Sequence, residues 1–483
     1  MKKELFLLFL NLCFISGIHA QCDKFSEAEA LHLTQIAKEN FKRIPELKKW
    51  LTENNHTENY STVATHVLFS WPMRVNSNYD DIPEYYNVSN YMDINRDDPN
   101  AGEKDWYCKY GSSALNYRYH EGNDYSVYPF NWRMMNNRNA YAAAGAAGIV
   151  LAVRDSIDND HNCIRDENEN NSPNYVAILH SDSSITRYLH LKTGSALVSV
   201  GQFVEEGQRL GNIGSSGHSS NPHLHFDLQY FRISDNSYNF VEPFYKSSDA
   251  SCNPFTSDTW WRNQKTFLTP KMIRVMTHSG TPVLQGDINS TYNPEFCPEF
   301  EDAKPKNQFA PGELLVVGVA LGHVNYRDSV HLSFYYPDGT LWLSTGKPVP
   351  DTRDGSPVNF RKKIYITHST AILSSAPSGT YKIVANFTYR PFYAADPYNP
   401  QTTPVTTTTT HFFTIGCDAD KTLSGYSYGT AGFIVSNSIN STQIIDGGKT
   451  IYQSANYIKL NPGFTATAGV TFKARIRSCN YCD

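Results

Sequence analysis

The sequence predicts a mainly β protein built in several parts, with one short helical segment near the N-terminus. From about residue 65, short β-like runs alternate with clusters of Asn, Asp, Gly and Pro, a pattern typical of strands joined by turns. Aromatic residues make up 13% of the chain and charged residues only 18%, which favours a folded protein over a disordered one. The length of 483 residues suggests roughly three domains at about 150 residues each.

The first residues have the features of a secretory signal peptide. Two lysines open the chain, a mostly apolar run covers residues 5–18, and small residues stand at Gly17 and Ala20. We therefore expect residues 1–20 to be a signal peptide and the mature protein to be secreted, extracellular or attached to the cell surface. The apolar run is too short to span a bilayer, and no later run approaches about 18 apolar residues, so we expect no transmembrane segment.

Cysteine usage agrees with export. Removal of residues 1–20 takes away Cys13 and leaves an even number of cysteines, which favours disulfides outside the cell over free thiols. The sequence leaves their pairing open. The remaining cysteines are Cys22, Cys108, Cys163, Cys252, Cys297, Cys417, Cys479 and Cys482.

The clearest helical pattern covers Ser26 to Leu51. Ser26 is suited to cap the helix, with Glu29 completing a capping box, and apolar residues follow at helical spacing. Two interpretations of residues 21–70 stay open: a propeptide that is cleaved, or a helical segment that is retained.

The β-like runs divide the rest of the chain into four further segments. We expect a first β domain at 71–250, a cysteine-containing linker at 251–304, a β-sandwich at 305–416 and a small β module at 417–483. The polar, acidic stretch at 155–170 predicts a long loop, either solvated and closed by Cys163 or able to bind Ca²⁺. The β-like runs are Gly148–Val153, Tyr175–His180, Ser184–Leu191 and Leu224–Tyr230 in the first domain, and Leu314–Val319, Val330–Tyr336, Tyr381–Thr388 and Thr406–Ile415 in the sandwich.

The net charge argues against nucleic-acid binding, and the histidines are concentrated in one region of the chain. The net charge of −5 has the wrong sign for binding through counterion release. Seven of the sixteen histidines lie between His120 and His225. One of them, His180, ends an apolar run and is expected to be structural.

Two short motifs in this region combine imidazole with carboxylate. His120 and Asp124 are four residues apart, and the spacing of His223 and His225 places both on the same face of a strand. Imidazole and carboxylate suit Zn²⁺, and a catalytic zinc typically keeps three protein ligands. Spacing alone would make both His223 and His225 ligands. Taken alone, either motif also fits a surface strand that carries histidines.

The run from Gly207 to Asp227, which contains Ser215-Ser216-Gly217 and ends in His223-Leu224-His225-Phe226-Asp227, resembles the signature of the lysostaphin/LytM-type (β-lytic) zinc metallopeptidases. Tyr188-Leu189-His190 resembles the Y-x-H element of that family, and His120 to Asp124 resembles its H-x-G-x-D element. The resemblance covers roughly residues 70–235 and is closest to secreted members from Bacteroidetes. Residues 435–479 look like the three-coathanger-stack module appended to exported Bacteroidetes proteins.

The resemblance implies a compact antiparallel β-sheet peptidase core, an Ig-like β-sandwich after it, and one Zn²⁺ in the catalytic domain. By resemblance, His120, Asp124 and His225 would hold the metal, and His190 and His223 would be catalytic residues beside it. Asp227 departs from the Glu that usually follows H-L-H-F in the family.

Three hypotheses for function follow. The first is a secreted bacterial zinc metalloendopeptidase that hydrolyses peptide bonds in the stem or cross-bridge of peptidoglycan. The second is an extracellular peptidase that acts on Gly-rich proteins such as elastin. The third, from another class, is a non-catalytic cell-wall-binding or activator module, which the full set of histidines argues against.

Overall fold

The computed structural model describes residues 27–476, except for residues 64, 77–85, 99, 111–115, 158–171, 220, 233, 235, 255, 267–269, 285–300, 326, 350–359, 392–402, 417, 428–430, 447–448, 455–456 and 468–469. Several predictions fall outside the described residues: the signal peptide at 1–20, the Ser26 cap, most of the acidic loop, and Cys22, Cys163, Cys297, Cys417, Cys479 and Cys482. The described part is mainly β, as predicted, and the strand pairs of the first two β parts are antiparallel except for one short parallel pair between residues 308–309 and 414–415.

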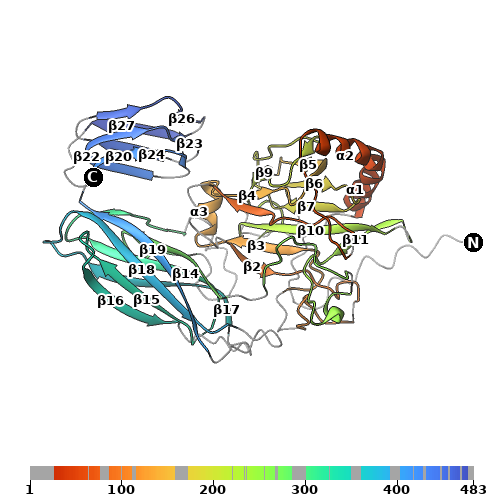
Figure 1. The fold of residues 1–483 in the computed structure, drawn as a ribbon, viewed down its shortest axis with the longest axis horizontal. Helices are drawn as coiled ribbons and strands as arrows, with labels where there is room; N and C mark the ends of the chain where they lie inside the picture. The colour runs from red at the N-terminus through yellow and green to blue at the C-terminus, as the bar shows by residue number, and fades with distance from the viewer. Residues whose placement is uncertain are drawn as a thin grey trace, which may run out of the picture.

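The predicted N-terminal helix is present, in two pieces that cover one face of the large sheet (Figure 1). Leu33 and Ala37 pack against Leu151, while Leu47 and Leu51 are buried against Ile149 of the same strand. The pieces are α1 (Glu27–Asn40) and α2 (Ile44–Glu53), joined by the 3₁₀ turn η1 (Phe41–Arg43). No helix in the described part of the chain is long and apolar enough to cross a membrane.

An eight-stranded antiparallel sheet forms the centre of the first β domain. Four of its strands match the predicted runs to within a few residues, because those runs alternate or are wholly apolar as a buried strand requires; the other four had no predicted run. In spatial order the strands are β2 (Tyr86–Asn90), β3 (Asn123–Val127), β10 (His223–Arg232), β7 (Ile185–Leu189), β6 (Tyr175–Leu179), β5 (Gly148–Arg154) and β8 (Phe203–Val204), and β11 (Ser237–Val241) also pairs with β10.

A smaller sheet and one disulfide complete this domain. The sheet consists of β1 (Met73–Val75), β4 (Ala140–Ala143) and β9 (Arg209–Asn212), and it shares a large apolar core with the eight-stranded sheet. Cys108 and Cys252 form a disulfide, which ties a loop before the central strands to the 3₁₀ turn η4 (Ala250–Cys252) after them. The short helix α3 (Asn131–Asn136) follows β3 directly.

Two further sheets form the predicted β-sandwich around an apolar core of their own. One strand of it, β12, lies within residues 251–304, the segment expected to be a linker, and pairs with β14 along its length. The first sheet contains β12 (Lys271–His278), β14 (Leu314–Asn325) and β17 (Phe360–Ala371); the second contains β13 (Gln308–Phe309), β19 (Val405–Ile415), β18 (Gly379–Tyr389), β15 (Ser329–Tyr335) and β16 (Leu341–Pro348).

The C-terminal module is built differently, because every strand pair described in it is parallel. Successive stretches of chain stack on one another as two narrow sheets, with Ile439, Ile445 and Tyr452 buried between them. The strands are β20 (Asp418–Leu423), β22 (Ala431–Ser441), β24 (Lys449–Ser454), β25 (Tyr457–Leu460) and β27 (Thr471–Ile476) in one sheet, and β21 (Tyr426–Ser427), β23 (Ile444–Ile445) and β26 (Thr465–Ala466) in the other.

The sandwich packs against the first β domain through the segment between β3 and α3. Tyr128 and Phe130 are buried with Ile273, Met276 and Tyr365 of the sandwich in one apolar cluster. Glu301, which precedes β13, accepts a hydrogen bond from the backbone N–H of Arg133 at 2.7 Å and so stabilises the first turn of α3. Two parts that are separate in sequence are therefore joined by apolar packing and a hydrogen bond from Glu301.

Because of Glu301 at this contact, the free energy of unfolding should depend on pH. Burial raises the pKa of Glu301 from 4.5 to about 7, although Arg133 and Lys363 act against the shift. The folded protein then holds a proton between pH 4.5 and about 7 that the unfolded chain has released, so stability falls as pH rises through this window. The expected slope is at most about 1.4 kcal/mol per pH unit. Thermal unfolding from pH 4.5 to 8 should show it, and the Glu301→Gln variant should flatten it; an unchanged slope in the variant would contradict this assignment.

Candidate metal centre

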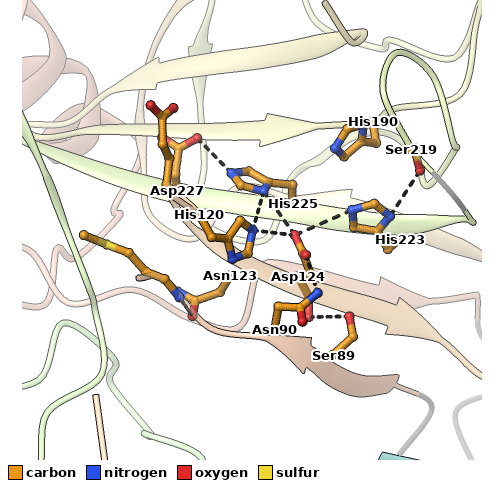
Figure 2. A network of polar contacts seen from close by, with 12 residues as sticks. Ser89, Asn90, His120, Asn123, Asp124, His190, Ser219, His223, His225 and Asp227 are labelled. Atoms are coloured by element: carbon orange, nitrogen blue, oxygen red, sulfur yellow. Dashed lines mark hydrogen bonds and ion pairs between the residues drawn. The ribbon is translucent and has the colours of Figure 1, made fainter. Parts of the chain in front are cut away.

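Three neighbouring strands bring the predicted site residues together. Asp124 lies on β3 directly opposite His225 on β10, and His225 is in turn opposite Leu189 at the end of β7. His190 follows β7, and His120 ends the loop that leads into β3. The alternation of side chains along β10 places His223 and His225 on the same face, as the spacing predicts. Figure 2 shows the five side chains gathered on that face.

Three ligand atoms form a small triangle. His120 Nε2 is 3.1 Å from Asp124 Oδ1 and 3.2 Å from His225 Nδ1, and the latter two atoms are 3.1 Å apart. Four ligands placed about 2.0–2.1 Å from a zinc ion would be roughly 3.3–3.4 Å apart, so the triangle has nearly the edges of such a tetrahedron. Among the described residues, the cluster around Asp124 contains these three ligands and neither His190 nor His223.

Hydrogen bonds on the far sides of the rings fix which nitrogens carry protons. His120 Nδ1 donates to the carbonyl oxygen of Tyr91 at 2.7 Å, which leaves a lone pair on Nε2. His225 Nε2 lies 3.5 Å from Asp227 Oδ2, so its N–H faces that carboxylate and the lone pair is on Nδ1. Two lone pairs and the Asp124 carboxylate therefore face one point, an arrangement that suits a cation and orients both rings as metal ligands require.

Asp227 is itself held by a buried arginine. Arg187 Nε donates to both carboxylate oxygens of Asp227, at 2.8 and 2.9 Å, and both side chains are almost wholly buried. Burial would raise the pKa of Asp227, but the guanidinium of Arg187 outweighs it and holds the pKa below its usual value. Gly122 makes room for this contact, since a Cβ there would lie 2.8 Å from both Asp227 Cβ and His225 Nε2.

The carboxylate of Asp124 is strongly stabilised in its charged form. Its second oxygen accepts from Asn90 Nδ2 at 2.9 Å. Burial acts to raise the pKa of Asp124, but the neighbouring His120 and His223 hold it well below the usual value. The group is therefore a charged ligand at any working pH.

His190 and His223 lie beside the triangle with their rings 4.5 Å apart between centroids. His190 Nδ1 donates to the Ser216 carbonyl oxygen at 2.8 Å, and His223 Nδ1 donates to the Asn221 carbonyl oxygen at 2.8 Å. In their neutral forms both rings thus keep a basic Nε2, and that of His223 is 3.5 Å from Asp124 Oδ1. Two imidazoles placed in this way can accept or donate a proton next to a bound ion.

All five residues predicted from the sequence, His120, Asp124, His190, His223 and His225, meet at this site. His180 lies elsewhere: its ring nitrogens bond the Ala147 carbonyl and Thr186 Oγ1, both at 2.8 Å, as expected of a structural histidine. The sequence analysis missed the roles of Arg187 and Gly122. Arg187 lies opposite Asp227 on the paired strands β7 and β10. Only the alignment of these two strands reveals that contact, and the sequence does not show the alignment.

The fold and the site together define a metallopeptidase-like centre, and comparisons with known proteins agree. The model of Peptidase family M23 matches residues 136–239. The peptidoglycan DD-endopeptidases ShyA and ShyC of Vibrio cholerae serotype O1 are 49% and 46% identical to this chain over 55 residues, 11% of this chain and 12% of each relative. The chain thus matches about an eighth of the length of these relatives.

Among solved structures, the catalytic domain of lysostaphin from Staphylococcus simulans also matches part of this chain. It is 22% identical, covers 25% of this chain and 74% of its own, and has a TM-score of 0.18. The family match lies within the first β domain, which contains this site. The matched segment includes His190, His223 and His225, while His120 and Asp124 precede it.

The contact between Asp227 and His225 gives a test of the cluster as a metal site. Replacing Asp227 by Asn removes the charge behind His225 and should weaken zinc affinity about 10- to 100-fold, the usual effect of losing such a partner. Competition against a chelator at pH 7 measures this directly. The exposed Asp97 provides a control, since Asp97→Asn makes the same chemical change on the surface. Unchanged affinity in a folded Asp227→Asn variant would contradict the assignment.

Proposed function

We propose that this protein is a secreted zinc metalloendopeptidase, with peptide bonds in the stem or cross-bridge of peptidoglycan as its substrate. The observation that carries the proposal is the buried triangle of His120, Asp124 and His225, with two further imidazoles beside it. The match to Peptidase family M23 and the relatives named peptidoglycan DD-endopeptidases support both the reaction and the substrate class.

The geometry supports a role for each side chain. His120, Asp124 and His225 would hold Zn²⁺, which when bound supplies a Lewis acid able to acidify water and polarise a scissile carbonyl. His190 and His223 would divide the remaining work: one, in its neutral form, accepts the proton of the attacking water and delivers it to the leaving amine, and the other, in its protonated form, donates to the developing oxyanion. Each has its Nδ1 tied to a backbone carbonyl, so each offers its Nε2 for these steps.

Substitutions should separate metal binding from catalysis. His120→Ala and Asp124→Ala should lose zinc and activity together, because each removes one of the three ligands. His223→Ala and His190→Ala should keep about one zinc per chain and lose activity by at least about a hundredfold, in line with the loss of a general acid or base. Metal analysis and peptidase assays on the same preparations measure both. Loss of zinc from a folded His223→Ala variant would overturn this division of roles.

Analysis of the cleavage products shows which substrate the protein hydrolyses. Purified peptidoglycans and elastin are digested separately, and mass spectrometry locates the new amine termini. We expect cleavage of peptidoglycan peptides by the wild type and none by Asp124→Ala, which serves as the matched inactive control. New termini in elastin alone would favour an extracellular peptidase for Gly-rich proteins. A zinc-loaded protein that cleaves neither substrate would contradict the peptidase proposal.

A further inference from the structure

The loop that carries His223 is held from outside the metal site. Asn221 and Pro222 directly precede β10, and the carbonyl oxygen of Asn221 accepts the hydrogen bond from His223 Nδ1. Ser219 Oγ donates to the same carbonyl at 3.0 Å. The orientation of the His223 ring therefore depends on where the backbone at Asn221 is placed.

One side chain from α3 contacts this segment through the Asn221 side chain and the Pro222 carbonyl. The amide nitrogen of Asn131 donates to Asn221 Oδ1 at 3.1 Å and lies 3.4 Å from the carbonyl oxygen of Pro222. Asn131 is buried, so these bonds are shielded from competition with water. It is the first residue of α3, and its position is set by the residue before it, Phe130.

Phe130 is anchored in the β-sandwich. Its ring is 5.5 Å from that of Tyr365 and 5.9 Å from that of His278, measured between centroids. His278 Nε2 and the Tyr365 hydroxyl are 2.6 Å apart, and His278 Nδ1 donates to the Ala303 carbonyl, so the two rings that receive Phe130 are themselves fixed. Gly318 leaves space for Tyr365, because a Cβ there would lie 2.1 Å from its hydroxyl.

We propose that Asn131 is a positioning residue for His223 and that the β-sandwich, by holding Phe130, is part of the catalytic apparatus and not only an appended domain. The link runs from Tyr365 and His278 through Phe130 to Asn131, and from Asn131 through the Asn221 side chain and the Pro222 carbonyl to His223. The ligands His120, Asp124 and His225 are not in this path, so we expect variants along it to keep the metal. The inference rests on the proposed function for its kinetic test.

The variant Asn131→Asp removes the N–H donor while keeping the side-chain volume. We expect kcat for the peptidase reaction to fall about ten- to a hundredfold, since small displacements of a catalytic group have effects of this size. KM should change less than about twofold and zinc content should not change. Asn136→Asp is the matched control, because Asn136 is exposed on the same helix and the change adds the same charge.

Two further measurements keep the proposal falsifiable. Phe130→Leu should also lower kcat, because it weakens the contact with the sandwich while the Asn131 side chain stays in place. NMR of the histidine ring nitrogens in the zinc-loaded protein should show altered signals for His223 in both variants, with those of His120 and His225 unchanged. Should Asn131→Asp not fold, Asn131→Ala removes the same donor without adding charge.

The outcomes separate this inference from the proposed function. Unchanged kcat and unchanged His223 signals in a folded Asn131 variant would overturn the positioning role, whatever the substrate. Loss of zinc from the variant would also overturn it, because the path would then include the metal ligands. A wild-type protein that hydrolyses no peptide would refute the proposed function, while the ring signals would still report whether Asn131 orients His223.

Discussion

The constraint on which this structure depends is electrostatic: two imidazole lone pairs and a carboxylate are held about 3 Å apart in a buried place. Without a cation between them, such groups would repel one another or take up protons. The surrounding residues fix which nitrogen of each ring faces the cluster. The Tyr91 carbonyl binds the far nitrogen of His120, and Asp227, paired with Arg187, faces the far nitrogen of His225. The central sheet is thus arranged around the orientation of two rings.

The sequence predicted what depends on local patterns. Alternation and apolar runs located β5, β6, β7 and β10. Pro337-Asp338-Gly339, residues typical of a turn, lie between β15 and β16, with Gly339 at φ 85°. The spacing of His223 and His225 placed them on one face correctly. Their separate roles could not come from spacing, because both positions point the same way and only the neighbouring strand decides which ring meets Asp124.

What the sequence did not predict depends on register and on distant contacts. Arg187 faces Asp227 only because β7 and β10 pair with Thr186 opposite Leu228, and no local signal sets that alignment. In the same way, β12 lies within the segment expected to be a linker and is a strand because it pairs with β14. Its residues Ile273, Val275 and Met276 are buried, although the sequence predicted no strand at these positions.

The parallel stacking of the C-terminal module has a consequence for how the protein could change over evolution. Each turn of this stack contacts the turns next to it, so its stability is close to a sum of neighbouring contacts. A duplication or deletion of one whole turn would lengthen or shorten the stack without altering the strands around the metal centre. The geometry of this site and the reach of the C-terminal end are therefore properties that selection can adjust separately.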